Sequence, residues 1–202
     1  PIASDHIVLT DLQRNFGCAL IDIGAETVSV SIFENGSLAS VHIFGIGSLD
    51  ITKDIALGLR VTPEEAENIK LGVVGFQTIN KKKLDEIVEA RLSDIFELID
   101  KYLKKIGRSG LLPAGAIITG GGAHIPMIES VAKTMLRIPV RIGFVEFPAV
   151  GSAKTSKDQR LLIAYGVATS SLDRVQTKSP RQNPGDHEGF IATIKNFFKQ
   201  LM

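Results

Sequence analysis

The sequence has one cysteine, four histidines and almost no net charge, and each shortage argues against a class of protein. The lone Cys18 cannot build a disulfide framework, so we interpret it as a small core residue in a chain suited to a reducing cytoplasm. The histidines are scattered without the i,i+4 spacing of a metal site. A formal charge of +1 creates no overall field to attract nucleic acid. No apolar run approaches the ~20 residues that span a bilayer.

The 202 residues, 44% hydrophobic and 22% charged, are sufficient to bury a sizeable core. Strand-like and helix-like apolar periods alternate along the chain, which indicates an α/β architecture. Strands are expected near 18–23, 28–33, 38–43, 114–118 and 140–142, with a less even strand-like stretch at 72–80. Helices are expected near 48–59, 64–71, 83–106, 126–136 and 161–172. The second starts with Thr62 as N-cap, Pro63 at the first helical position and Glu65 at the capping-box place. The third has its apolar residues in one stripe and ends at Gly107 and Gly110. The first three strands form a meander whose hairpin turn is Asn35-Gly36.

Two glycine-marked turns each follow a short apolar strand. The first is Asp22-Ile23-Gly24-Ala25-Glu26-Thr27 and the second is Thr119-Gly120-Gly121-Gly122-Ala123. Glycine lets main-chain N–H groups approach a phosphate or a ribose where a side chain would collide. One such turn alone is usually only a tight turn, but a facing pair predicts a nucleotide cleft.

The first turn and the strand after it, up to Gly36, resemble the phosphate-binding hairpin of the actin/Hsp70-like ATPases. The segments 51–56 and 66–70 narrow the resemblance to the FtsA family of bacterial cell-division proteins, and 119–125 resembles that family's adenosine loop. The resemblance implies an actin-like (ribonuclease H-like) α/β domain with an inserted subdomain, the second half of a two-lobed fold, followed by a C-terminal amphipathic helix. The sequence then starts in mid-protein, the first half's phosphate hairpin is not in it, and the segment between Lys70 and Leu84 is shorter than expected.

The resemblance also implies a division into segments: subdomain 2A, first part, at 1–47; subdomain 2B at 48–110; subdomain 2A, second part with its closing helix, at 111–172; a flexible linker at 173–188; and a membrane-targeting helix at 189–202.

ATP and Mg²⁺ are the cofactors implied by the resemblance. Asp22 would hold Mg²⁺ through water, Gly24 and the Thr27 region would face the phosphates, and Glu67 would accept from the ribose hydroxyls. Lys70 would pack against or bond the adenine, while the loop residues Gly120, Gly121, Gly122 and Ile125 would border the sugar and base. The alternatives are a turn-capping Asp22 and an exposed i,i+3 ion pair between Glu67 and Lys70.

The first turn departs from the family pattern Asp-x-Gly-Gly-Gly-Thr-Thr-Asp, because Ala25, Glu26, Val28 and Ser29 occupy the later positions. Glu26 places a carboxylate near the phosphates, which is unfavourable unless a cation screens it. We therefore expect nucleotide binding with at most slow ATPase activity and no catalytic residue.

The last fourteen residues have helical periodicity. Six apolar side chains fall on one side and two lysines on the other: Phe190, Ile191, Ile194, Phe197, Phe198 and Leu201, against Lys195 and Lys199. Such a stripe is more often a core helix, but its place after a linker favours an interfacial helix drawn to anionic lipid. The FtsA-like family carries such a tail.

An FtsA-like protein implies several partners: the C-terminal peptide of the tubulin-like protein FtsZ, further copies of itself in a filament, other divisome proteins and the cytoplasmic face of the cell membrane at the division site. We assign the FtsZ peptide to subdomain 2B, at the exposed cations Arg91, Lys101, Lys104 and Lys105. The alternative is a solvated helix face without a partner. The other functions considered are a pilus-assembly protein with an FtsA-like core and an actin-superfamily kinase, and the tail argues against both.

Overall fold

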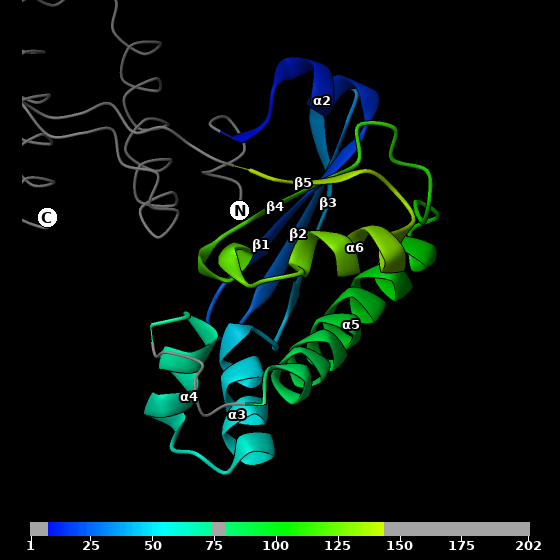
Figure 1. Cartoon of the computed structure of the whole chain (residues 1–202). Coiled ribbons are helices and arrows are strands. Elements are labelled where there is room, and N and C mark those ends of the chain that lie inside the picture. Colours follow the sequence, from blue (N-terminus) through cyan, green and yellow to red (C-terminus); the bar gives the residue numbers. More distant parts are fainter. Residues whose placement is uncertain (1–7, 74–79, 144–202) are drawn as a thin grey trace, which may run out of the picture.

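A five-stranded sheet with strand order β3-β2-β1-β4-β5 forms the centre of the molecule (Figure 1). The computed structural model describes residues 8–73 and 80–143. The strands are β1 (Cys18–Ile23), β2 (Val28–Glu34), β3 (Ser37–Phe44), β4 (Ala116–Thr119) and β5 (Val140–Ile142). β1, β2 and β3 form the predicted antiparallel meander, and β4 pairs in parallel with both β1 and β5. The α/β fold class is confirmed.

The hairpin turn and the buried strand β1 follow directly from the sequence. Asn35 and Gly36 both have positive φ, 51° and 75°, as a two-residue hairpin turn requires. Every residue of β1 is buried because the strand lies in the middle of the sheet. Cys18 is fully buried and burial raises the pKa of its thiol to about 11, which agrees with a core role.

Four helices share one hydrophobic core with the sheet: α3 (Ser48–Leu59), α4 (Pro63–Lys70), α5 (Lys81–Lys105) and α6 (Ile128–Leu136). In Figure 1, α5 and α6 run along one face of the sheet, and α3 and α4 lie beyond one end of the strands. The core contains alternate residues of β1, namely Ala19, Ile21 and Ile23. The other side of β1 contributes Cys18 and Leu20 to a smaller cluster with Val8, Leu9, Phe33 and Ile117.

Local capping signals set the helix ends. α4 begins where predicted, with Thr62 and Glu65 forming a reciprocal capping box and Pro63 in the first turn. α5 begins at Lys81 rather than Lys83, because the Asn80 side chain accepts a hydrogen bond from the Lys83 amide. Gly107, with φ of 69°, follows the end of this helix as expected.

The prediction missed one helix and misplaced the start of another. Helix α2 (Asp11–Phe16) has only six residues and is capped by Thr10. None of its residues is buried, so the sequence has no apolar periodicity there that would predict a helix. Helix α6 begins at Ile128, and a 3₁₀ turn, η2 (Gly121–His124), occupies the chain before it. The expected helix start at Pro126 is therefore wrong.

Several predicted segments lie outside the described residues. These are most of the strand-like stretch 72–80, the helix 161–172, the linker 173–188 and the tail 189–202 with all eight of its assigned residues. Within the described part of the chain, no helix is long and apolar enough to cross a membrane.

Candidate nucleotide-binding site

The two glycine turns lie side by side at one edge of the sheet. β1 and β4 are adjacent parallel strands, and Asp22 is paired in register with Thr119. The carboxyl ends of these strands therefore meet at the same edge, where the first turn and the loop Gly120–Ile125 begin. The first turn is closed by the Gly24 amide, which donates to the Thr27 carbonyl over 2.9 Å. Edges of this kind are where open α/β sheets bind ligands.

Asp22 is the buried acid of this edge. It is 6% exposed, and its neighbours in the sheet are Ser29 on β2 and Thr119 on β4. Burial raises the pKa of the Asp22 carboxyl. Gly120 has φ of 88°, and a Cβ there would be 2.3 Å from Asp22 Oδ1. Only glycine at this position lets the loop pass so close to the carboxyl group.

The three loop glycines have different reasons to be glycine. A Cβ on Gly122 would be 2.4 Å from Ile23 Cγ2, so Gly122, like Gly120, is required by packing against the end of β1. At Gly121, no atom of the described residues lies within 4 Å of the corresponding point. The prediction treated all three as ligand-facing. Of the three, only Gly121 borders space that the described part of the chain leaves open.

The first turn also rests on the start of helix α3. The amides of Ser48 and Leu49 donate to the carbonyls of Gly24 and Ala25, over 2.9 and 2.8 Å. A Cβ on Gly47 would be 2.3 Å from the Ala25 carbonyl oxygen, so the approach requires glycine there. Sequence reasoning missed this junction. A signal for it was present in the sequence: Gly47 is followed three residues later by Asp50, the spacing at which a side chain can cap the start of a helix. In the structure, the Asp50 carboxylate accepts a hydrogen bond from the Gly47 amide over 2.9 Å.

Glu67 and Lys70, both on α4, form an ion pair of 2.7 Å, and the hydrogen bonds of this pair to Ser48 and Thr52 tie α4 to α3. Lys70 Nζ also donates to the Ser48 carbonyl over 3.1 Å and to Thr52 Oγ1 over 2.8 Å, and its side chain is only 5% exposed. The alternative of an exposed ion pair is therefore wrong for Lys70. Thr52, which sequence reasoning missed, donates to Glu67 over 2.5 Å.

Glu67 remains partly open, with a side chain 38% exposed. Burial alone would raise the pKa of its carboxyl, but the hydrogen bonds from Lys70 and Thr52 outweigh burial and lower it. Glu67 thus contributes a carboxylate, held in its charged form, from α4.

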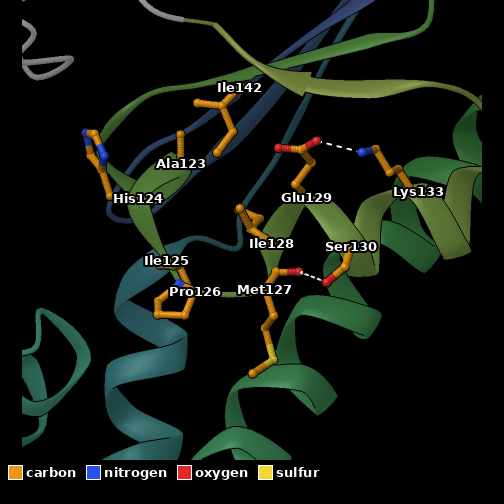
Figure 2. Close-up of a pocket in the computed structure, with 10 residues that line it drawn as sticks. All are labelled: Ala123, His124, Ile125, Pro126, Met127, Ile128, Glu129, Ser130, Lys133 and Ile142. Carbon is orange, nitrogen blue, oxygen red and sulfur yellow. Dashed lines mark hydrogen bonds and ion pairs between the residues drawn. The ribbon is translucent and has the colours of Figure 1, made fainter.

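A cavity of about 510 Å³ lies between the glycine loop and α6 (Figure 2). Of the predicted nucleotide residues, only Ile125 lines it. Three of its polar side chains are already engaged: Glu129 pairs with Lys133 at 2.6 Å, and Ser130 Oγ donates to the Met127 carbonyl over 2.7 Å. The cavity therefore adjoins the candidate site without containing Asp22.

The four cations assigned to a protein partner do not form one equivalent set. Arg91 is directed at α3, where it makes two hydrogen bonds to the Asp54 carboxylate, and its side chain is 29% exposed. Lys101 pairs with Glu97 and Lys104 with Asp100, each at 2.7 Å, from side chains that remain more than half exposed. Lys105 is exposed at the end of α5. The expectation that Arg91 is a freely exposed cation is wrong, because it joins α3 to α5.

In the described part of the chain, no group of three or more histidine, cysteine or acidic residues is arranged to hold a metal ion. A metal at this edge would have to use Asp22 with ligands from water or from a bound phosphate, as Mg²⁺ commonly does.

Solved structures, among them an archaeal actin homolog that superposes with a TM-score of 0.61, show that the fold is actin-like. The type IV pilus biogenesis complex PilM–PilN contains a chain that superposes with a TM-score of 0.69 at 16% identity, over 85% of this chain and 51% of that one. MreB5 of Spiroplasma citri bound to ADP superposes with a TM-score of 0.67 at 15% identity, over 88% of this chain and 60% of that one.

Sequence comparison is more specific than the fold. The FtsA protein of Bacillus subtilis is 33% identical over 163 residues, which cover 70% of this chain and 37% of that protein. This chain thus spans less than half the length of this relative. Because 70% of 202 residues is fewer than 163, the relative also carries extra residues inside the matched region. The family model for the cell division protein FtsA matches residues 19–166. On these matches, the chain belongs to the FtsA family of cell-division proteins.

Proposed function

We propose that this chain is the nucleotide-binding part of a cell-division adaptor that binds ATP with Mg²⁺. The observation that carries the proposal is the adjacency of two glycine turns around the buried Asp22, in a chain of the FtsA family. The structural neighbour MreB5 of Spiroplasma citri is described as bound to ADP, which supports a nucleotide as the ligand of this fold.

The residues at this edge fit such a ligand. The Asp22 carboxylate is a hard oxygen donor of the kind that Mg²⁺ prefers, held through water. Gly24 and Thr27 would face the phosphates, while Gly121 leaves room for the sugar and base beside Ile125. The open carboxylate of Glu67 would accept from the ribose hydroxyls. Bound Mg²⁺ would neutralise phosphate charge, which matters here because Glu26 is exposed on the turn.

The adaptor role extends the nucleotide site to three partners. Copies of the protein would assemble into filaments, the exposed lysines of α5 would bind the acidic C-terminal peptide of FtsZ, and residues 189–202 would attach the assembly to the cytoplasmic face of the membrane at the division site. Family membership supports this reading, and other division proteins would join the same assembly. Slow ATP hydrolysis suits a switch between assembled and free states rather than an enzyme acting on a substrate.

Reconstitution on vesicles tests the whole proposal. Full-length protein, ATP and Mg²⁺ are mixed with fluorescent FtsZ filaments and anionic liposomes, and the FtsZ that sediments with the vesicles is measured. We expect recruitment that requires the protein and increases with ATP. Recruitment that is equal with and without the protein would refute the adaptor role. Recruitment unaffected by removing ATP would refute the part played by the nucleotide.

A further inference from the structure

The ammonium group of Lys70 is fully committed to protein acceptors. A lysine has three N–H donors, and here three acceptors lie within hydrogen-bond reach: the Ser48 carbonyl, Thr52 Oγ1 and Glu67 Oε2. The side chain is almost wholly buried between α3 and α4. No donor remains to bond the base of a nucleotide, and the burial of the side chain leaves little of it to pack against the base; these are the two roles that the resemblance gives this lysine.

Ser48 connects this cluster to the first glycine turn. Its carbonyl accepts from Lys70 and its amide donates to the Gly24 carbonyl, so one residue joins the lysine to the turn. The Leu49 amide makes the parallel bond to Ala25. Gly47 lies too close to Ala25 for any side chain, so the start of α3 and the turn have little room to move independently.

We propose that Lys70 is a positioning residue that fixes the Gly24–Thr27 turn through Ser48, and that it does not bind the nucleotide base. This inference rests on the proposed nucleotide site and specifies how α4 acts on it. The turn faces the phosphates in that proposal, so Lys70 controls affinity for the phosphate chain. Residues other than Lys70 bind the adenosine moiety.

Amide hydrogen exchange tests the link without any ligand. In Lys70→Met, the Ser48 and Leu49 amides should exchange about tenfold faster, as expected when a hydrogen bond to a charged group is lost. The buried amides of α5 should keep their protection. Lys53→Met is the matched control, because Lys53 lies on α3 with Ser48 and Leu49, pairs with Asp50 and has a 72% exposed side chain. Unchanged exchange at Ser48 and Leu49 in Lys70→Met would overturn the proposal.

Ligand affinities separate positioning from base contact. In the full-length protein, Lys70→Met should weaken ATP binding about tenfold and change adenosine binding, measured by competition against a fluorescent ATP analogue, by less than twofold. An equal loss for ATP and adenosine, a loss for adenosine alone or no loss for either would each overturn it.

Two further comparisons protect the interpretation. The double variant Lys70→Met, Glu67→Gln removes both charges, so the Glu67 carboxylate is not left unpaired, and the same ATP-specific loss should appear. Thr52→Val removes the hydroxyl that accepts from Lys70 at similar volume and should show a smaller loss of the same kind. If the unaltered protein does not bind ATP at all, the proposed function fails, and the exchange measurement alone decides the positioning role.

Discussion

Gly120 passes so close to Asp22 that a Cβ on the glycine would be 2.3 Å from the carboxylate oxygen Oδ1. The contact joins the end of β4 to the end of β1 and covers the buried acid with main chain. A feature that looks like a flexible loop in the sequence is therefore part of the wall around Asp22. The glycines of this loop can accordingly be tested one at a time.

Gly121→Val should remove ATP binding without unfolding the protein. No atom of residues 8–73 or 80–143 lies within 4 Å of the added Cβ, so the substitution extends into the space proposed for the nucleotide. We expect at least a tenfold loss of ATP affinity, measured by calorimetry on the full-length protein, with a melting temperature within about 2 °C of the parent.

Gly122→Val is the matched comparison, because its Cβ would be 2.4 Å from Ile23. This variant should destabilise the fold by about 1–3 kcal/mol in urea denaturation. ATP affinity that survives Gly121→Val would show that the loop does not border the ligand.

Asp22→Asn should stabilise the fold while weakening Mg²⁺-dependent ATP binding. Burial raises the pKa of Asp22, so the folded protein binds this proton more tightly than the unfolded chain does. The stability due to that proton is present below the ordinary aspartate pKa of about 3.9 and is lost as pH rises through the raised value. The advantage of asparagine in thermal melts should therefore grow from about pH 3 towards pH 7.

The second half of the Asp22 prediction concerns the metal. ATP affinity of the parent should rise with Mg²⁺, and that of Asp22→Asn should depend on Mg²⁺ much less. If Asp22 only caps a turn, both proteins would respond to Mg²⁺ alike.

The elements that could be predicted from the sequence are those set by local signals. The Asn35-Gly36 turn, the Thr62–Glu65 capping box and the apolar stripe of α5 each involve residues close in the chain, and all three are present. Helix α2 escaped prediction because its apolar residues Leu12 and Phe16 are exposed, so it has no buried stripe to detect.

Contacts between distant segments could not be predicted from the sequence. The two turns were correctly paired, but the reasons for Gly120 and Gly122 lie in β1, about a hundred positions earlier in the chain. Arg91 falls on the flank of the α5 stripe, where periodicity alone cannot distinguish solvent from a neighbouring helix. Asp54, 37 positions away, decides that question. Such pairings depend on packing, which a single sequence does not display.

Asp100→Ala should destabilise the protein by about 1–3 kcal/mol, since it removes a buried carboxylate that joins the ends of α5 and α6. Asp100 accepts from Ser109 Oγ at 2.7 Å and pairs with Lys104 at 2.7 Å and with Arg137, just beyond α6, at 3.5 Å. Burial alone would raise the pKa of Asp100, but the hydrogen bonds from Lys104 and Ser109 lower it. Its stabilisation is therefore present above about pH 4 and is lost as pH falls through the lowered value.

Urea denaturation at pH 7 and at about pH 3 measures both parts of the Asp100 prediction. Asp94→Asn, on the exposed side of the same helix, is the control and should change stability by less than about 0.5 kcal/mol. A cost for Asp100→Ala that persists unchanged at low pH would mean that the carboxylate charge is not the stabilising group.

Phe197→Glu combined with Phe198→Glu should abolish sedimentation with anionic liposomes, because it places two charges on the apolar side of the sequence-predicted tail helix. Each apolar side chain that is fully buried there would contribute roughly 1.5–3 kcal/mol, and each lysine adds about 1 kcal/mol near an anionic surface. Lys195→Gln should only weaken binding and reduce its salt sensitivity. As a control, Phe197→Leu with Phe198→Leu keeps the helix side apolar and should preserve attachment to the liposomes. If the double glutamate variant still sediments with the liposomes, the tail is not the membrane anchor.

Lys101→Glu with Lys105→Glu should weaken binding of the acidic FtsZ peptide by at least about fivefold, roughly 1 kcal/mol, and should lower its dependence on salt. Both lysines lie on the side of α5 away from the core, so the reversal leaves the fold intact.

Arg91→Glu is a poor probe of this surface because it would set a second carboxylate against Asp54 and loosen α3 from α5. Its effect on peptide affinity should therefore be accompanied by a fall in melting temperature that the lysine variants do not show.

Lys133→Glu on α6 is the matched control for charge alone, since Lys133 is similarly exposed and pairs with Glu129 as Lys101 pairs with Glu97. Fluorescence titration of a labelled peptide in the full-length protein gives each affinity. Equal affinities for the double lysine variant and the Lys133 control would leave α5 as a solvated helix face without this partner.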